Sequence, residues 1–274
     1  MKVAPQYMDE IPCYAPELAI ENDGYPDVSY GDYFKLEDGS FWFRSRNRII
    51  KYLLEKFMNT NQPFNFIEIG CGTGYVLKGL EAFTNAKLSG AEIYLGGLKF
   101  AKKRLPNIQF VQLDARHMPF ENELDSVGAF DVLEHIVEDE TVMQSVFQSL
   151  KSGGKFFISV PQHQSLYCNI DAYLQHKRRY SRSEMLTKLK NAGFEIEFVS
   201  SFVFCLFPMM AISRWMKKIK PSKLNYQNTV QTEMVLPPAL DKIMDVFMDL
   251  DQWLIKIGLS LPVGGSLFVV AKKK

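Results

Sequence analysis

The sequence predicts an α/β fold in which a mostly parallel sheet carries helices on both faces. Two observations lead to this prediction. Strand-like and helix-like segments alternate over residues 44–202, which is the pattern of parallel strands joined by helical crossovers. A short apolar strand at 64–69 runs directly into a glycine-rich turn and then into a helix, as happens where such a sheet binds a ligand at its carboxyl edge.

The individual elements follow from the spacing of apolar residues. A helix is predicted over 44–58, where apolar residues recur every three or four positions. A later helix begins at a capping box formed by Ser181 and Glu184 and ends at Gly193. Besides 64–69, strands are predicted at 87–93, 108–113, 126–131, 155–160, 194–202 and 266–271.

The same patterns divide the chain into four parts. Residues 1–43, with several prolines and acids, are expected to form an irregular N-terminal arm. Residues 44–202 are the ligand-binding core, 203–263 a helical insertion, and 264–274 the last strand of the core sheet. With 274 residues, of which 47% are hydrophobic, the chain is long enough to bury a substantial core.

Composition excludes some classes of function. A formal net charge of +1 disfavours a nucleic-acid partner, which usually requires a basic surface. The four cysteines (Cys13, Cys71, Cys168 and Cys205) lack the spacing of a zinc site or a disulfide framework, so we expect them to be reduced. The first residues carry acids and prolines where a signal peptide would be apolar, and a cytoplasmic location is therefore expected.

The glycine-rich turn is the most informative local feature. Gly70, Gly72 and Gly74 alternate after the acid Glu68, and glycine lets the backbone take positive φ and approach a ligand closely. The helix that follows presents free N–H groups at its start. A dinucleotide fingerprint would need its third glycine at position 75, where Tyr75 stands. The turn therefore predicts a nucleotide-type cofactor, with an NAD-dependent oxidoreductase as the less favoured alternative.

The pattern E-x-G-x-G-x-G resembles the first motif of the class I methyltransferases that use S-adenosylmethionine (SAM). The resemblance is strong over residues 41–200, and its subgroup is that of the small-molecule enzymes similar to quinone-biosynthesis methyltransferases. It implies a Rossmann-like seven-stranded sheet whose last two strands form an antiparallel pair at one edge. It also implies SAM as the cofactor, with its amino-acid end wrapped by the glycine loop.

The resemblance assigns further cofactor contacts. Glu92, at the end of the second strand, would accept hydrogen bonds from the ribose hydroxyls, and Asp114 would meet the adenine amine. Asp131 would face the methyl-donor region. Trp42 and Arg44 would close over the cofactor, with an arginine at its carboxylate, although core packing is the alternative for the tryptophan. The expected cofactor-binding residues are Glu68, Gly70, Cys71, Gly72, Thr73, Gly74, Glu92, Ile93, Asp114, Ala115, Asp131, Trp42 and Arg44.

Two histidines are candidate catalytic residues, because imidazole titrates near neutrality. His135 and His176 follow predicted strands, and packing against the next helix is the alternative role of His135. Residues 131–135 read D-x-x-E-H and resemble the E-x-x-E-H of quinone-biosynthesis O-methyltransferases, which holds a divalent ion. An aspartate replaces the first glutamate here, and we expect no metal. Arg178 and Arg179 would hold an anionic group of the acceptor or form a solvated basic turn.

The expected function is methyl transfer from SAM to an oxygen or nitrogen atom of a small-molecule or lipid-like acceptor. A SAM-binding protein without transfer activity is an alternative. A nucleic-acid methyltransferase is disfavoured by the net charge and by the lack of a D/N-P-P-Y-like tetrapeptide after the fourth strand.

Two interpretations of the insertion stay open. It is either a helical cap that buries its apolar stripes, or a wall for a greasy acceptor that also touches a membrane peripherally through 203–220. The second interpretation draws on the apolar run at 202–212 and on the basic residues that follow it. These are Arg214, Lys217, Lys218 and Lys220. The sequence makes no prediction of oligomeric state.

Overall fold

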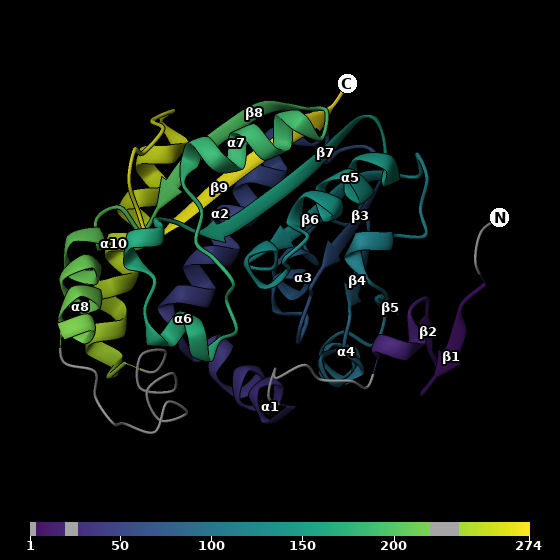
Figure 1. The fold of residues 1–274 in the computed structure, drawn as a ribbon, viewed down its shortest axis with the longest axis horizontal. Helices are drawn as coiled ribbons and strands as arrows, with labels where there is room; N and C mark the ends of the chain where they lie inside the picture. The colour runs from purple at the N-terminus through teal and green to yellow at the C-terminus, as the bar shows by residue number, and fades with distance from the viewer. Residues whose placement is uncertain (1–3, 20–26, 220–235) are drawn as a thin grey trace.

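The computed structural model describes residues 4–19, 27–219 and 236–274. Its centre is a nine-stranded sheet with the strand order β1-β2-β5-β4-β3-β6-β7-β9-β8 (Figure 1). The predicted α/β architecture is thereby confirmed. The strands are β1 (Gln6–Met8), β2 (Ile11–Cys13), β3 (Phe64–Ile69), β4 (Ala86–Glu92), β5 (Gln109–Gln112), β6 (Leu124–Phe130), β7 (Leu150–Pro161), β8 (Phe194–Phe202) and β9 (Ser266–Lys273).

The seven strands from β3 to β9 form the predicted sheet. β3 pairs in parallel with β4 and β6, which places it at the centre. β9 runs antiparallel to both β7 and β8, so the expected antiparallel pair at one edge is confirmed. The carboxyl ends of β3, β4 and β6 consequently open at the same edge of the sheet, where parallel sheets bind ligands.

The N-terminal residues differ from the expected irregular arm. β1 and β2 form an antiparallel hairpin, and β2 extends the sheet through a pairing of Cys13 with Gln112 of β5. The side-chain amide of the buried Gln112 also accepts a hydrogen bond from the backbone N–H of Ala15 (3.1 Å) and donates one to the backbone carbonyl of Ala15 (2.8 Å). An edge strand offers unpaired backbone groups, so this order is imposed by a tertiary partner that the local sequence does not reveal.

Helices cover both faces of the sheet (Figure 1). On one face the core contains residues of α2 (Phe41–Phe57), α3 (Tyr75–Leu80) and α4 (Leu95–Arg104). On the other it contains residues of α5 (Asp139–Ser149) and α7 (Arg182–Asn191). The remaining helical elements outside the insertion are α1 (Asp27–Leu36), α6 (Asn169–Tyr173), and the 3-10 turns η1 (Pro16–Leu18), η2 (Glu37–Gly39), η3 (Ala115–His117), η4 (Leu133–His135) and η5 (Gln164–Leu166).

The described part of the insertion between β8 and β9 consists of α8 (Phe207–Ile219) and α10 (Pro238–Lys256). Both helices lie at one end of the sheet, beside the β8–β9 edge (Figure 1). The fully buried carboxylate of Asp251 accepts hydrogen bonds from the backbone N–H groups of Phe204 (2.6 Å) and Cys205 (3.0 Å). These bonds fix α10 to the segment that leaves β8. Among the described helices, none has the length and hydropathy needed to span a bilayer.

Candidate active site

Two cavities meet at the carboxyl edge of the sheet. The larger has a volume of about 660 Å³ and the smaller about 500 Å³. Both are lined by Tyr30 of α1, by Gly70 and Gly72 after β3, and by Asp131 and His135 after β6. A single elongated ligand can therefore occupy both cavities across the glycine loop.

The glycine loop adopts the backbone conformation that requires glycine. Gly70, Gly72 and Gly74 have φ values of 66°, 50° and 76°. A Cβ on Gly70 would lie 2.4 Å from a methyl carbon of Val132, whereas one on Gly72 would meet no described atom within 4 Å. The open side of Gly72 is thus the place where a ligand can approach the backbone.

Gly74 has a packing role that the sequence analysis did not foresee. It is absent from the described lining of both cavities. It precedes α3 in the left-handed conformation, and a Cβ there would lie 3.2 Å from that of Ala101 in α4. Gly74 therefore allows close packing of α3 on α4, and its expected contact with the cofactor stays a prediction.

Thr73 and Cys71 line the larger cavity, as the sequence predicts. The Thr73 hydroxyl is already engaged, because it donates to the Glu37 carboxylate (2.7 Å) and accepts from Arg104 (2.8 Å). Glu37 and Arg104 form a buried ion pair at 2.7 Å. This network, which the sequence did not predict, holds the loop in place before any ligand binds.

The smaller cavity collects the residues predicted to meet an adenosine. The Glu92 carboxylate accepts from the N–H groups of Gly72 (3.0 Å) and Ile93 (2.8 Å), and burial raises its pKa. Each of its oxygens keeps a second lone pair for a hydroxyl donor. Asp114 and Ala115 line the same cavity, with the Asp114 carboxylate held by Arg116 (2.9–3.0 Å).

Acidic groups gather where the larger cavity meets the loop. Glu68 is 2% exposed, and one of its carboxylate oxygens has no hydrogen-bond partner among the described groups. Burial raises the pKa of Glu68 well above its ordinary value. Asp131 follows β6 and accepts from Arg46 (2.5 Å) and Ser159 (3.2 Å). A cationic ligand would relieve this accumulation of carboxyl groups.

Trp42 lines the larger cavity, but Arg44 does not belong to the described lining. Arg44 pairs with Asp241 of α10, so its guanidinium is already engaged, and its expected contact with a cofactor carboxylate stays a prediction. Arg46 lines the cavity instead. It precedes the buried Ile49 and Ile50 by three and four positions, which places it on the face of α2 that packs against the sheet. The spacing of apolar residues along this helix therefore already indicated that Arg46 lies on the side that packs against the sheet.

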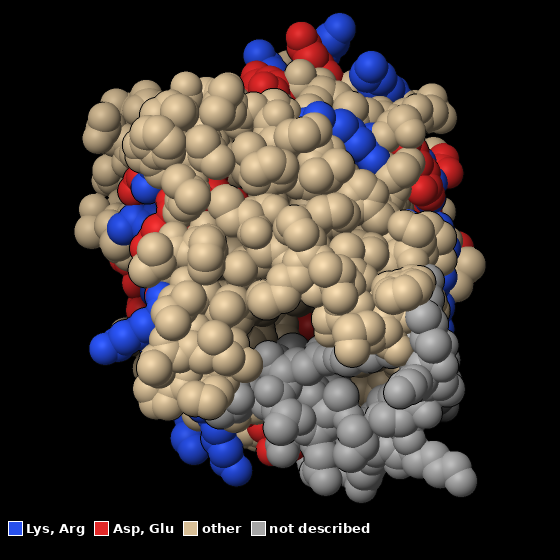
Figure 2. Space-filling view, turned by 90° about the vertical axis from the view of Figure 1, so that its left-hand side faces the viewer, with Lys and Arg blue, Asp and Glu red and all other residues tan. Residues whose placement is uncertain are grey.

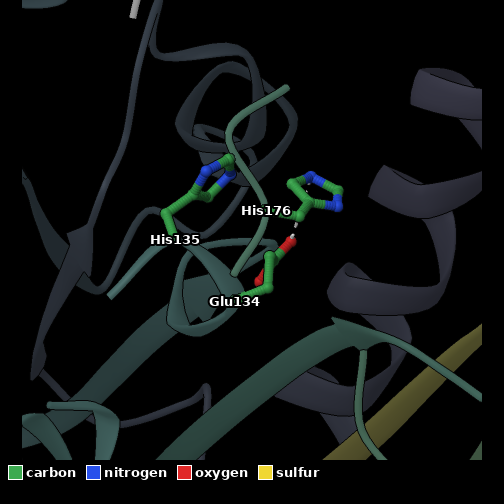
Figure 3. A group of neighbouring side chains, drawn as sticks. All are labelled: Glu134, His135 and His176. Carbon is green, nitrogen blue, oxygen red and sulfur yellow. Dashed lines mark ion pairs between the residues drawn. The ribbon is translucent and has the colours of Figure 1, made fainter. Parts of the chain in front are cut away.

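Glu134, His135 and His176 lie close together in the larger cavity (Figure 3). Their ligand atoms all lie within 4.8 Å of one another, a spacing at which three such groups could hold a metal ion. The expectation of no metal stays a prediction. Glu134 is fully buried, and neither carboxylate oxygen has a hydrogen-bond partner in the described residues. Burial, and then the charge of Asp131, raises its pKa well above the ordinary value.

His176 is held by a buried carboxylate. Its Nδ1 lies 3.1 Å from Asp171, and its Nε2 lies 4.0 Å from Glu134. Asp171 also accepts from Arg179 (2.8 Å), and although burial opposes ionisation, these hydrogen bonds hold its pKa well below the usual range. An Asp171 carboxylate bonded to Nδ1–H leaves Nε2 as the free acceptor of the ring, directed at the Glu134 side of the cavity.

His135 has a different environment. Burial, and then the charge of His176, lowers its pKa from 6.5 to about 3. Its ring lies 4.8 Å from that of His176 at an interplanar angle of 84°. A neutral, weakly basic His135 is a poor general base near neutral pH.

The two arginines after His176 are structural. Arg178 pairs with Asp139 (3.1 Å), and the buried Arg179 pairs with Asp171. Of the two roles left open by the sequence, anion binding or a solvated turn, neither describes the observed ion pair of Arg178 with Asp139. Arg179 lines the larger cavity, but its guanidinium is committed to holding Asp171.

Comparison with known proteins decides which ligand this edge binds. Residues 67–158, which contain the glycine loop and the ends of β4 and β6, match the family described as a methyltransferase domain. The chain carries a class I SAM-dependent methyltransferase domain. The earlier resemblance is thereby confirmed, and SAM is the cofactor of this domain.

Named relatives agree with the assignment of this methyltransferase domain. The chain is 25% identical over 165 residues to a probable S-adenosylmethionine-dependent methyltransferase of Mycolicibacterium smegmatis. The aligned region covers 59% of this chain and 62% of that protein. It is 26% identical over 174 residues to the sterol 24-C-methyltransferase of Candida albicans, covering 57% and 46%. The matches thus span about half to three fifths of these relatives' lengths.

A solved structure confirms the fold of this domain. Phosphoethanolamine N-methyltransferase 2 of Haemonchus contortus, in complex with SAM, superposes with a TM-score of 0.60 at 18% identity. The superposition covers 92% of this chain and 58% of that one. The two proteins therefore share a Rossmann-like fold.

The described residues fit SAM. The open side of Gly72 admits a ligand against the backbone, and the buried Glu92 carboxylate keeps acceptor capacity toward hydroxyl groups. The unpartnered oxygen of Glu68 can accept a hydrogen bond from an ammonium group of the ligand. The sequence analysis missed Tyr30 and Glu37, because both reach the site through tertiary packing of the N-terminal residues. It also missed Arg46, although the apolar spacing of α2 indicated the side on which Arg46 lies.

Proposed function

We propose that this protein transfers the methyl group of SAM to an oxygen or nitrogen atom of a small-molecule or lipid-like acceptor. The supporting observation is the pair Glu134 and His176, which lies in the larger cavity close to Asp131, where the two cavities meet. An acceptor in the larger cavity would approach a cofactor whose adenosine half occupies the smaller one.

The chain's own residues would hold the two halves of SAM separately. Glu92 would accept hydrogen bonds from the ribose, and Asp114 with Ala115 would border the adenine in the smaller cavity. Arg46, which lines the larger cavity with the glycine loop, would be the arginine near the cofactor carboxylate. Bound SAM supplies the electrophilic methyl group, so the protein provides alignment and exclusion of water.

Glu134 and His176 would prepare the acceptor. A hydroxyl or amine donor would satisfy the buried Glu134 carboxyl group, which otherwise loses hydrogen bonds on burial. The Nε2 atom of His176 would then take the acceptor's proton as the new bond to the methyl group forms. Asp171 fixes the ring of His176 for this role.

The far wall of the larger cavity favours an acceptor with an apolar part. It is lined by side chains of the segment after β8 and of the insertion, which offer few polar groups. Such a wall would bind an alkyl or isoprenoid portion by burial of apolar surface. These residues are Val203, Leu206, Met209, Met210, Leu236 and Met244.

Methylation of carbon is a second candidate. It is supported by the similarity to the Candida albicans sterol 24-C-methyltransferase. The buried, unpartnered Glu134 favours an acceptor with a hydrogen-bond donor, which supports transfer to oxygen or nitrogen.

Mass spectrometry of the product tests the proposal. The full chain is incubated with SAM carrying a deuterated methyl group and with lipid and small-molecule extracts, and labelled products are fragmented to locate the methyl. His176→Gln should lower kcat about a hundredfold and leave SAM affinity unchanged, because it removes the proton acceptor alone. The matched control His117→Gln changes an exposed histidine outside both cavities and should have no effect.

Three results would contradict this account. A labelled methyl on carbon would assign the second candidate, and SAM binding without any labelled product would identify a SAM-binding protein. Full activity of His176→Gln would remove the assigned base. Dialysis against EDTA should leave activity intact, and a loss restored by a divalent ion would assign Glu134, His135 and His176 to a metal.

A further inference from the structure

The insertion carries an unusual surface. Apart from Tyr7 and Val137, every exposed large apolar side chain in the described residues lies in α8, in α10 or in the turn after α10. Figure 2 shows this end of the molecule as a wide uncharged area with charged side chains at its margins. Soluble monomers rarely expose continuous apolar areas of this kind without a partner. We call this surface the apolar face; its residues are Met209, Ile212, Trp215, Met216, Leu240, Ile243, Val246, Phe247, Leu250, Trp253, Ile257 and Leu259.

Helical spacing builds the apolar face from one side of α10. Ile243, Phe247, Leu250, Trp253 and Ile257 recur every three or four positions and are exposed by 40–56%. These residues therefore form one continuous apolar side of an amphipathic helix and are not isolated exposed residues. On α8 the same spacing relates Met209 and Ile212 to Trp215 and Met216, and all four side chains are exposed.

The acidic side chains of α10 are engaged by α2, whereas two of its lysines are exposed. Asp245 and Asp249 both pair with Arg48 of α2, and Asp245 also pairs with Arg44, so their negative charge is partly compensated within the protein. The exposed Lys242 and Lys256 stand on the same helix as the stripe. Basic side chains around an apolar surface complement the negative potential of an anionic membrane.

The apolar face is continuous with the larger cavity. Met209 is 53% exposed on the face and also lines the cavity, and Arg214 and Met244 bring both helices to the same wall. Figure 2 shows a hollow in this face beside the undescribed residues, with an acidic side chain visible inside it. An acyl or isoprenoid chain leaving a lipid layer could enter the cavity without crossing water.

We propose that the apolar face docks the protein onto the surface of an anionic lipid bilayer, with α8 and α10 lying in the plane of the interface. Two of the three tryptophans of the chain, Trp215 and Trp253, are on the face, and the indole ring favours the boundary between lipid and water. Embedding one side of such helices needs no spanning segment. Uptake of the acceptor from that bilayer rests on the proposed function, whereas the docking itself does not.

This inference shifts the membrane contact expected at 203–220. The exposed apolar side chains of α8 through Met216 belong to the face, but α10 contributes more of them. The side chains of Lys217, Lys218 and Lys220, which were expected to form the basic flank, lie outside the described residues. The exposed lysines of α10 in the described residues are Lys242 and Lys256.

Vesicle flotation tests the docking. The full chain is mixed with vesicles of phosphatidylcholine, with and without phosphatidylglycerol, and the floated fraction gives the partition coefficient. Phe247→Ser with Trp253→Ser should weaken partition by about tenfold or more, because two apolar side chains lose their contact with lipid. The matched control, Tyr7→Ser with Val137→Ser, removes the exposed apolar side chains outside the face and should partition like the original protein.

Each outcome decides the proposal. Flotation of the original chain that increases with phosphatidylglycerol and is lost only in the Phe247/Trp253 variant supports it. No flotation, or equal flotation of both variants, overturns it. A dimer seen by analytical ultracentrifugation that the Phe247/Trp253 variant dissociates, without vesicle binding, assigns the face to a second copy and also overturns it. SAM affinity measured on all three proteins separates this test from the proposed function, since docking can fail while the cofactor still binds.

Discussion

Substitution of Gly72 by alanine separates the cost of backbone strain from the loss of the ligand site. Gly72 has a φ of 50°, and a Cβ there would meet no described atom within 4 Å. The left-handed conformation costs an alanine about 1–2 kcal/mol. For a domain of this size such a loss lowers Tm by only several degrees, so the protein should still fold. The added methyl would project into the space that SAM needs.

The matched control is Gly153→Ala. Gly153 has a φ of 80° in β7, a Cβ there would also meet no described atom within 4 Å, and it lies outside the described lining of both cavities. Both variants should therefore lose similar stability. Gly70→Ala should be worse, because its Cβ would lie 2.4 Å from Val132 and overpacking adds to the strain.

Isothermal titration with SAM and urea denaturation measure the two effects on the same samples. Gly72→Ala should lose SAM affinity by at least about tenfold, or about 1.4 kcal/mol, while Gly153→Ala should bind normally. Unchanged SAM affinity in Gly72→Ala would refute the placement of the cofactor against the loop. An equal loss in Gly153→Ala would show that strain alone explains the effect.

Three further predictions concern buried groups. Asp251→Ala should lower the free energy of unfolding in urea by about 2–4 kcal/mol, because the N–H groups of Phe204 and Cys205 lose a buried charged acceptor; a loss of a few tenths would contradict this. Folding lowers the pKa of His135 from 6.5 to about 3, so between these pH values the unfolded chain binds a proton that the folded protein does not. The free energy of unfolding should therefore decrease as pH falls, by up to about 1.4 kcal/mol per pH unit. In His135→Gln this decrease should be less steep. NMR should show no titration of this imidazole between about pH 7 and about pH 5, and a midpoint near 6.5 would disprove the burial effect. Asp171→Asn should lower kcat about a hundredfold without changing SAM affinity, and unaltered kcat would remove Asp171 as the group that orients the base.

Local patterns predicted the parts of the site that depend on neighbouring residues. The glycine loop, Glu92 and Asp131 stand at the carboxyl ends of successive strands, and a parallel sheet brings such ends to one edge. Because the strands themselves were predicted from short apolar runs, the sequence could place these residues at the carboxyl edge of the sheet. The packing of Gly74 on Ala101 was not foreseen, since close packing needs glycine as much as a ligand does.

The remaining parts depend on contacts between distant segments. Glu37 reaches Thr73 across 36 positions, and Asp171 orders a loop whose arginines looked like a solvated turn. Arg46 lines the cavity and Arg44 does not because of the rotation of α2 about its axis against the sheet. The spacing of apolar residues in α2 did indicate this rotation. The hairpin formed by β1 and β2 exists because β5 offers an edge, and no local pattern in a proline-containing segment reports the presence of such an edge.

A crystal structure of the full chain with S-adenosylhomocysteine tests the central claim most directly. The account predicts adenine beside Asp114, the ribose hydroxyls on Glu92, the main chain of Gly70 and Gly72 against the ligand, and the sulfur directed into the larger cavity toward Glu134 and His176. A ligand bound elsewhere, or one whose sulfur is directed away from the larger cavity, would contradict it.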